Sequence, residues 1–176
     1  MDAGLQRRVQ RYGWDKAAPY YDRLWQSQLE PAQTALLEMA GLARRGRLLD
    51  VACGTGLVTF RAANLVDPEY EIIGTDISEQ MIAAARVAAR DRGTANVRFE
   101  RMDAENLRFS GDEFDTVLCA LGLMYVPDPE NAVREFYRVL RPGGRAVAAV
   151  WGKRSNCGWA EIFPIVDARV QSDVCP

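Results

Sequence analysis

Short apolar blocks alternate with amphipathic segments over most of the chain. The blocks predict five strands, at residues 47–52, 71–75, 97–102, 114–119 and 145–151. The segments between and after them have the apolar spacing of helices, at residues 57–65, 78–92, 131–140 and 159–170. Strands that alternate with helices in this way favour β–α–β crossovers. We therefore expect an α/β fold with a doubly wound, mostly parallel sheet that helices cover on both faces.

The first 45 residues have a purely helical pattern. Residues 4–28 predict an irregular helix rich in aromatic side chains, and residues 31–43 predict a regular one. Pro31 would stand in the first turn of that second helix, where its missing N–H costs no hydrogen bond. The pattern divides the chain into an N-terminal helical cap, residues 1–45, and an α/β core, residues 46–176.

Several short signals support these elements. Ser78 is a favourable N-cap and Gly93 a favourable C-terminal stop for the helix between them. Residues 117–120 and 147–150 are unbroken apolar runs, as in strands that are buried on both faces. The segment Arg141-Pro142-Gly143-Gly144 has the composition of a turn between a helix and a strand.

Ligands of such sheets bind beyond the carboxyl ends of the strands. The first strand leads into Asp50-Val51-Ala52-Cys53-Gly54-Thr55-Gly56, whose glycines allow a tight turn and let a ligand lie against the main chain. The helix after this loop offers free N–H groups to an anionic group. Asp76 ends the second strand, 20 positions after Gly56, where a carboxylate can accept both hydroxyls of a ribose. A turn or capping aspartate is the alternative reading of Asp76.

The next two strand ends carry less specific signals. Residues 102–105, Met-Asp-Ala-Glu, could reach the amine of an adenine, or could begin a short helix that Asp103 caps. Residues 120–125 are unusually apolar for a loop, and such loops at a sheet edge line pockets more often than they face water. Leu123 and Met124 could instead belong to the core.

Charge and composition narrow the possible functions. The net charge of −2 argues against a nucleic-acid partner, and we expect the basic pairs Arg7-Arg8 and Arg44-Arg45 to be solvated surface. The chain has no histidine, which excludes histidine-dependent triads and histidine–metal chemistry within it. Its 4 cysteines are scattered, which predicts reduced thiols and no metal site.

Targeting signals are also missing from the pattern. The amino terminus is too polar for a secretory signal, and no apolar run approaches the roughly 20 residues of a membrane span. We therefore expect a cytoplasmic protein without a membrane span.

Together these residues resemble the class I S-adenosylmethionine-dependent methyltransferases, especially the ubiquinone/menaquinone-biosynthesis-like group of small-molecule enzymes. The resemblance covers about residues 12–152 and implies a Rossmann-like fold with S-adenosylmethionine as cofactor. The family's first loop glycine is Ala52 here. The segments that carry the resemblance, in chain order, are Leu48–Gly56, Gly74–Ser78, Met102–Glu105, Phe114-Asp115, Tyr125–Pro129 and Arg138–Gly144.

The resemblance also implies a role for each part of the site. The loop from Asp50 to Gly56 would hold the methionine part of the cofactor, Asp76 the ribose, and Asp103 with Ala104 the adenine edge. Ile77 would pack on the adenine, while Ala120 and Leu121 would lie beneath the reacting sulfur. The full set of expected cofactor-binding residues is Asp50, Ala52, Cys53, Gly54, Thr55, Gly56, Asp76, Ile77, Met81, Asp103, Ala104, Ala120 and Leu121.

The implied chemistry suits a chain without histidine. A sulfonium methyl is already electrophilic, so the protein mainly aligns an O, N or C nucleophile of a small molecule with it and excludes water. A base is needed only if the acceptor loses a proton. Asp22, Tyr20 and Tyr21 are the nearest candidates for such a base, and no catalytic residue is assigned.

Because N-terminal helices often cover the cofactor in this family, one or more of Tyr12, Trp14, Tyr20 and Tyr21 would close the site, with core packing as the alternative.

The family's sheet usually continues into two antiparallel strands beyond the last helix predicted here. We therefore expect a sheet without these last two strands, whose fifth strand has an unpaired edge prone to association. Three explanations stay open: a shortened chain, a homodimer or second chain that covers the edge, and a module that binds cofactor without turnover. The enzymatic alternative, a nicotinamide-dependent oxidoreductase, would have a third loop glycine where Thr59 stands.

Overall fold

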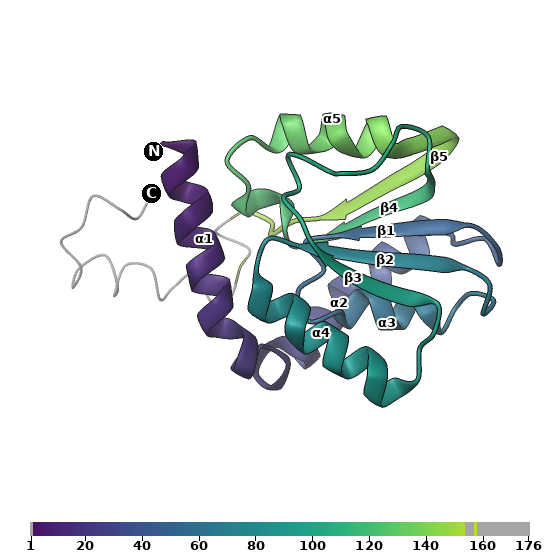
Figure 1. Ribbon diagram of the computed structural model, residues 1–176, viewed down its shortest axis with the longest axis horizontal. Coiled ribbons are helices and arrows are strands. Elements are labelled where there is room, and N and C mark those ends of the chain that lie inside the picture. Colours follow the sequence, from purple (N-terminus) through teal and green to yellow (C-terminus); the bar gives the residue numbers. More distant parts are fainter. Residues whose placement is uncertain (1, 154–156, 158–176) are drawn as a thin grey trace.

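The computed structural model describes residues 2–153 and 157. Within them, one parallel sheet has the strand order β3-β2-β1-β4-β5. The strands are β1 (Arg47–Val51), β2 (Glu71–Asp76), β3 (Val97–Arg101), β4 (Phe114–Ala120) and β5 (Leu140–Ala149). The chain moves outward from β1 to β3, then returns to the other side of β1 (Figure 1). This confirms the doubly wound sheet and places its switch point between β1 and β4.

Helices cover both faces of this sheet (Figure 1). On one face lie α2 (Tyr21–Ala40), α3 (Leu57–Ala63) and α4 (Glu79–Arg92), and on the other lies α5 (Pro129–Val139). Successive strand residues point to opposite faces. Leu48 and Ile72 therefore join the core beneath α2–α4, whereas Leu49 and Ile73 join the core beneath α5. The layering is the Rossmann-like arrangement that the sequence predicts.

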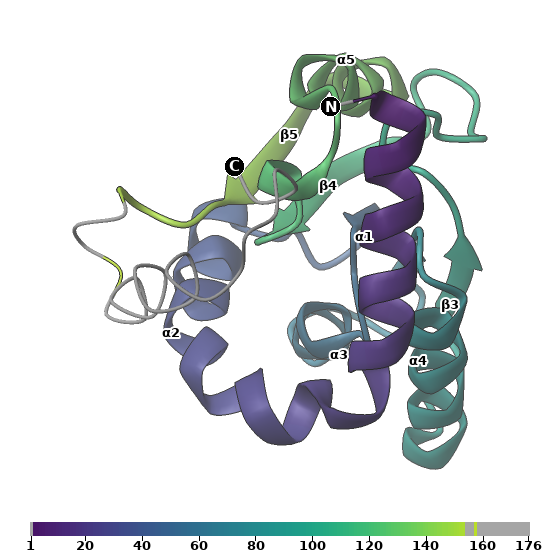
Figure 2. The same ribbon diagram turned by 90° about the vertical axis from the view of Figure 1, so that its left-hand side faces the viewer.

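The N-terminal helix α1 (Ala3–Ala17) lies across the carboxyl-terminal edge of the sheet (Figure 2). The 3-10 helix η1 (Ala18–Tyr20) then turns the chain into α2. Asp15 near the end of α1 accepts hydrogen bonds from Ser78 Oγ at 2.6 Å and from the Gln80 N–H at 3.1 Å. These bonds join α1 to the first turn of α4 and hold it beside the strand ends.

The predicted helix start at Pro31 is wrong. Pro31 lies inside α2, which is continuous from Tyr21 to Ala40. The ring removes the hydrogen bond to the carbonyl of Ser27, but both residues are exposed, so water can satisfy that carbonyl. Leu29 and Leu36 are buried on either side of the proline, and this packing keeps the helix continuous.

The segment Arg141–Gly144 is also placed differently from its prediction. It belongs to β5 as an irregularity rather than to a preceding turn, because Phe114 pairs with Leu140 whereas Thr116 pairs with Arg145. The extra residues bulge out from the pairing opposite Asp115. Gly143 has a φ of 82° there, which favours glycine. Because Leu140 pairs with Phe114, β5 begins at Leu140 instead of at residue 145. Arg141 Nη1 binds the carboxylate of Asp115 at 2.8 Å beside this irregularity.

The remaining elements agree closely with the pattern. β1, β2, β3 and β4 each end within one residue of the prediction. Ser78 Oγ caps α4 by accepting the Met81 N–H at 3.1 Å, and Gly93 ends that helix with a φ of 66°. The helix predicted at residues 159–170 lies outside the described residues. None of the helices described is both long and apolar enough to cross a membrane.

Candidate functional site

The carboxyl ends of the strands and the inner side of α1 line a hollow of about 720 Å³, part of it open to solvent, called here the main cavity. It lies at the switch point of the sheet, where folds of this kind bind ligands. A smaller cavity of about 330 Å³, called the side cavity, adjoins it because Tyr21, Ala52 and Gly54 line both. The pair forms one curved space around the end of β1.

Most of the predicted cofactor residues line this space. Two do not: Thr55 and Gly56 lie in the loop behind it, and Thr55 Oγ1 donates a hydrogen bond to Asp22 Oδ1 at 2.5 Å. The predicted residues in the main cavity are Ala52, Gly54, Asp76, Ile77, Met81, Asp103, Ala104, Ala120 and Leu121. Those in the side cavity are Asp50, Ala52, Cys53, Gly54, Ala120 and Leu121.

Asp76 ends β2 with its carboxylate fixed by the main chain. Its Oδ2 accepts the Gly54 N–H and its Oδ1 accepts the Ser78 N–H, both at 2.9 Å. Burial raises the pKa of Asp76, while these N–H groups oppose that rise. The carboxylate is therefore held rigidly at the wall of the main cavity, and each oxygen keeps a lone pair for a ligand hydroxyl.

Asp50 lies one strand away in a drier setting. Its Oδ2 accepts the hydroxyl of Thr59 at 2.6 Å, and its Oδ1 is buried without a hydrogen-bond partner among the described residues. Desolvation raises the pKa of this carboxyl group to about 7. A buried acceptor without a partner costs free energy. Because Asp50 lines the side cavity, a cationic donor in that space would satisfy the oxygen.

The loop between β1 and α3 is backbone-strained. Ala52, Gly54 and Gly56 have φ values of 56°, 56° and 90°. The two glycines adopt this region without cost, but Ala52 pays for its Cβ. Leu121, at the end of β4, also has a φ of 59°. Ala52 and Leu121 line both cavities, and strained residues of this kind cluster at functional sites.

Arg7 of α1 binds the segment that follows β3. Its Nε and Nη2 donate to the two carboxylate oxygens of Glu105 at 3.0 and 2.8 Å, and its Nε lies 3.0 Å from Asp103 Oδ2. The Glu105 side chain is only 3% exposed. The expectation that the Arg7-Arg8 pair is solvated surface is therefore wrong for Arg7. Its partners Asp103 and Glu105 are 96 and 98 positions away in sequence, so no local pattern could show them.

Aromatic side chains close the cavity on the side of α1. Trp14 makes edge-to-face contacts with Tyr21 and Tyr125, at centroid distances of 6.0 and 5.4 Å. All three rings line the main cavity. Of the four aromatic candidates for closing the site, Trp14 and Tyr21 are in position. The other two, Tyr12 and Tyr20, are 63% and 55% exposed and line neither cavity.

The three candidate bases are poorly placed to take a proton. Desolvation raises the pKa of Tyr21 to about 12, so its phenol stays protonated near neutral pH. The carboxylate of Asp22 binds Thr55 and lines neither cavity. Tyr20 is exposed outside the space. Sequence reasoning also missed Arg7, Gln10 and residues 126–127 as parts of the cavity wall. These residues come to the cavity only through tertiary contacts, which no local pattern shows.

A family model for a methyltransferase domain matches residues 48–144 of this chain. The chain is 39% identical over 128 residues to a ubiquinone/menaquinone biosynthesis C-methyltransferase of Azotobacter vinelandii. The aligned region covers 72% of this chain and 51% of that protein. It is 38% identical over 128 residues to the protein of the same name from Ectopseudomonas mendocina, with coverages of 72% and 50%. The chain thus spans about half the length of these relatives.

Solved structures give a similar result. The YcgJ protein of Bacillus subtilis is 31% identical, with a TM-score of 0.64 over 68% of this chain and 50% of that chain. The [4+2]-cyclase SpnF is 28% identical, with a TM-score of 0.74 over 81% of this chain and 59% of that chain. A neighbour named as a cyclase shows that the fold alone does not specify methyl transfer.

Proposed function

Because the chain belongs to the methyltransferase domain family, we propose that it binds S-adenosylmethionine in the two adjoining cavities and transfers the methyl group to a small molecule. One observation carries this proposal. The curved space has the fixed carboxylate of Asp76 in its main part and the unpartnered, buried Oδ1 of Asp50 at its side part. The cofactor has ribose hydroxyls and an ammonium group, and both are donors that such oxygens would accept.

The residues of the space divide naturally between the parts of the cofactor. Ile77 and Met81 offer an apolar surface for the adenine, and Asp103 with Ala104 would contact its edge. The loop from Asp50 to Gly56 would hold the methionine part, with Asp50 near the ammonium group. Thr55 and Gly56 support this loop from behind rather than touch the ligand. Ala120 and Leu121 line both cavities, which suits the position beneath the sulfur.

The bound sulfonium would supply an electrophilic methyl carbon. The residues of this chain would bind the acceptor in line with that carbon and keep water away. Trp14, Tyr21 and Tyr125 form the apolar wall suited to this task. The acceptor atom, whether C, N or O, would donate an electron pair to the methyl carbon as the carbon–sulfur pair returns to sulfur. We assign no catalytic base: of the three candidates, Tyr21 stays protonated near neutral pH, and Asp22 and Tyr20 line neither cavity.

The acceptor and the partners are narrower proposals. Two relatives are named for ubiquinone and menaquinone biosynthesis and for methylation at carbon, which favours an aromatic, quinol-like acceptor.

We further propose that a second copy or a second chain pairs with the outer edge of β5, which has no partner strand among the described residues. Light scattering on the purified chain would test this: a monomer at all concentrations would refute pairing with a second copy. Free thiols at Cys53 and Cys119 fit a cytoplasmic location.

Calorimetric titration with S-adenosylmethionine, S-adenosylhomocysteine and NAD tests the cofactor assignment. Binding of the two sulfur nucleosides but not of NAD is expected. Asp76→Ala should weaken that binding by about 1–3 kcal/mol, because two ribose hydroxyls lose their acceptor. Asp91→Ala, an exposed change on α4, is the control and should have no effect. Transfer of a labelled methyl group to quinols and phenols then separates an enzyme from a module that only binds the cofactor.

A further inference from the structure

Helix α1 has one face that lines the main cavity and an opposite face that exposes apolar side chains. Its inner face contributes Arg7 and Trp14 to the wall of the main cavity. On the opposite side, Leu5, Val9 and Tyr12 are 42%, 46% and 63% exposed. Their spacing of four and three residues places them in one stripe along the helix. A helix that only covers a cavity would have polar residues on this outer side.

The flank of this stripe is basic. Arg8 and Arg11 of α1 meet Arg101 and Arg108, from the segment at the end of β3, around one open hollow. The acidic residue that lines it, Asp103, is already paired with Arg7 at 3.0 Å. This group of four arginines is called here the basic hollow. It stands out because the chain as a whole has a net charge of −2.

Few interactions within the protein use the charge of the basic hollow. Arg101 Nε donates to the carbonyl of Ile77 at 3.1 Å, and Arg108 Nη2 donates to the carbonyl of Arg101 at 2.8 Å. Arg101 has one distant carboxylate, Glu79, at 3.8 Å. Within the described part of the chain, Arg8 and Arg11 form no ion pair. Like charges that gather without counter-charges repel each other, and a bound polyanion would relieve that repulsion.

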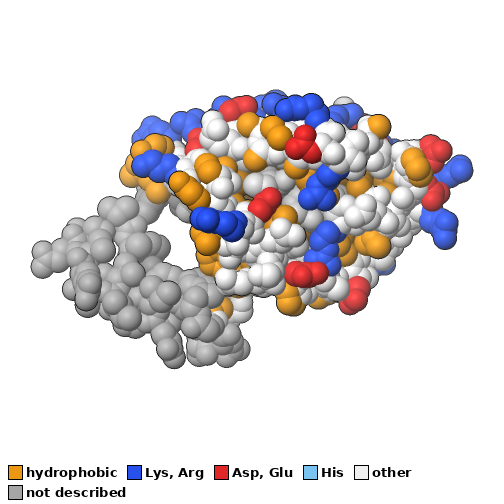
Figure 3. Space-filling view, turned by 90° about the horizontal axis from the view of Figure 1, so that it is seen from below, with side chains coloured by type: hydrophobic (Ala, Val, Ile, Leu, Met, Phe, Trp, Pro, Cys, Tyr) orange, Lys and Arg blue, Asp and Glu red, His pale blue; other side chains and the backbone are white. Residues whose placement is uncertain are grey.

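Basic and apolar side chains are interleaved over this part of the surface. Figure 3 shows Lys and Arg beside hydrophobic side chains at its upper left, the end of the molecule where α1 lies. A helix with an apolar stripe flanked by arginines is the pattern of an interfacial helix, which lies in the headgroup region of a bilayer. Anionic headgroups attract the arginines, and the apolar stripe enters the acyl boundary.

We propose that the apolar stripe of α1 and the basic hollow together bind the surface of a membrane that contains anionic lipids. A second copy of this chain is a poorer partner, because two basic hollows would repel each other. A nucleic acid would use the arginines but would have no use for the aliphatic Leu5 and Val9, since bases stack on aromatic rings. The proposal does not depend on methyl transfer, because it concerns the face of α1 turned away from the cavity.

Binding to vesicles tests the proposal directly. The chain should sediment with vesicles of phosphatidylcholine and phosphatidylglycerol, and much less with phosphatidylcholine alone. Replacing Arg8 and Arg11 together by Gln should weaken the binding at least tenfold, since each arginine near an anionic surface contributes roughly a fivefold factor. Replacing Leu5 and Val9 together by Ser should also weaken it, by removing the apolar stripe while leaving the charge unchanged.

The matched control is the other basic pair. Arg44 and Arg45 are 89% and 83% exposed, in the connection that leads into β1. Replacing both by Gln makes the same change of charge at the opposite end of the sheet and should leave vesicle binding unchanged. Calorimetry with S-adenosylhomocysteine or, if no cofactor binds, circular dichroism shows that each variant is folded.

Four results would overturn the proposal. The first is no sedimentation with the anionic vesicles, and the second is an equal loss in both arginine double variants. The third is concentration-dependent self-association that the Leu5/Val9 double variant abolishes, which would assign the stripe to a second copy. Inorganic phosphate provides a last arm of the test. If millimolar phosphate removes vesicle binding completely at constant ionic strength, the hollow binds free phosphate rather than a membrane.

Discussion

At the scale of single residues, Ala52 shows how the loop carries strain. Its φ of 56° costs an alanine roughly 1–2 kcal/mol, whereas a glycine loses roughly 0.5–1 kcal/mol of chain entropy on folding. We therefore expect Ala52→Gly to raise the free energy of unfolding by up to about 1 kcal/mol in urea titrations. Ala62→Gly, in the buried face of α3, is the control and should lower it. A loss of stability in Ala52→Gly would show that its Cβ packing outweighs the strain.

Asp50 predicts how stability depends on pH. Its pKa is about 7 in the folded chain against 3.8 for an unperturbed group, chiefly because of desolvation. The folded state then holds a proton that the unfolded state has lost between these values. This proton raises the free energy of unfolding relative to an ionised Asp50 by about 4 kcal/mol at most. The contribution is complete below pH 4 and is lost as the pH rises toward 7.

The Asp50→Asn variant tests this assignment. Asparagine can still accept the Thr59 hydroxyl but does not ionise, so the variant should match the parent below pH 4 and exceed it increasingly in stability as the pH rises to 8. A smaller decline of the same sign should persist in the variant, because burial also raises the pKa of Asp76. Equal slopes in the parent and the variant, measured by denaturant unfolding across this range, would contradict the assignment.

At the scale of elements, α1 is held over the site at two places: Asp15 binds the first turn of α4, and Arg7 binds the segment that follows β3. Arg7 binds Glu105 through two hydrogen bonds, and charge-assisted bonds of this kind are stronger than neutral ones. Arg7→Gln should make α1 open roughly tenfold more often. Hydrogen exchange of residues 3–17 would measure this, together with faster release of S-adenosylhomocysteine. Arg8→Gln makes the same change of charge on the same helix without that contact, and exchange should be unaltered.

The same elements show what local sequence can and cannot predict. The first four strands were located within one residue, because apolar periodicity and glycine loops are local signals, whereas the start of β5 was placed five residues too late. The cap at Ser78 and the stop at Gly93 were found for the same reason. Pro31 was misread because packing on both sides of it outweighs a local rule. Arg7 was misread because its partner lies 98 positions away. The errors thus occur where long-range contacts decide the structure.

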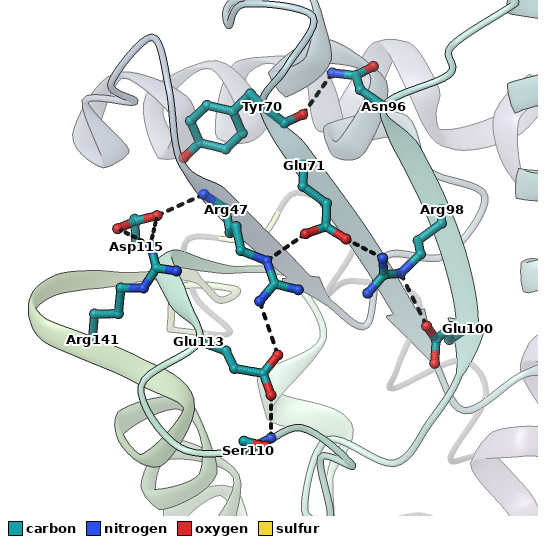
Figure 4. A network of polar contacts seen from close by, with 10 residues as sticks. All are labelled: Arg47, Tyr70, Glu71, Asn96, Arg98, Glu100, Ser110, Glu113, Asp115 and Arg141. Atoms are coloured by element: carbon teal, nitrogen blue, oxygen red, sulfur yellow. Dashed lines mark hydrogen bonds and ion pairs between the residues drawn. The ribbon is translucent and has the colours of Figure 1, made fainter.

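At the scale of the whole molecule, one end of the sheet forms the cavities and the other end contributes to stability. The carboxyl end carries the cavities, with strained and desolvated residues. The amino end carries a network of ion pairs across neighbouring strands, shown in Figure 4. There Arg47 binds Glu71 and Glu113, and Glu71 also binds Arg98. Strain at the functional end is compatible with a stable fold because the other end joins β1, β2 and β3 without using any cavity residue.

Arg47 tests this division of the molecule. Its side chain is 26% exposed, lies over the ring of Phe114 at 5.1 Å, and contacts Glu113 at 3.1 Å. Arg47→Met should keep much of the packing and lose the ion pairs, which lowers the free energy of unfolding by about 1 kcal/mol. The loss should shrink in 1 M salt, where the Debye length falls to about 3 Å. Arg45→Met, with its 83% exposed side chain, should cost much less.

The affinity for S-adenosylhomocysteine is the decisive second measurement for Arg47→Met. It should stay at the parental value at temperatures where both proteins are folded, because Arg47 begins β1 while the cavities lie at the opposite, carboxyl end of that strand. A weakened affinity would show that the register of β1 at its amino end controls the position of the loop from Asp50 to Gly56. The two ends of the sheet would then be coupled through a single strand of five residues, and stability and binding could not be altered independently.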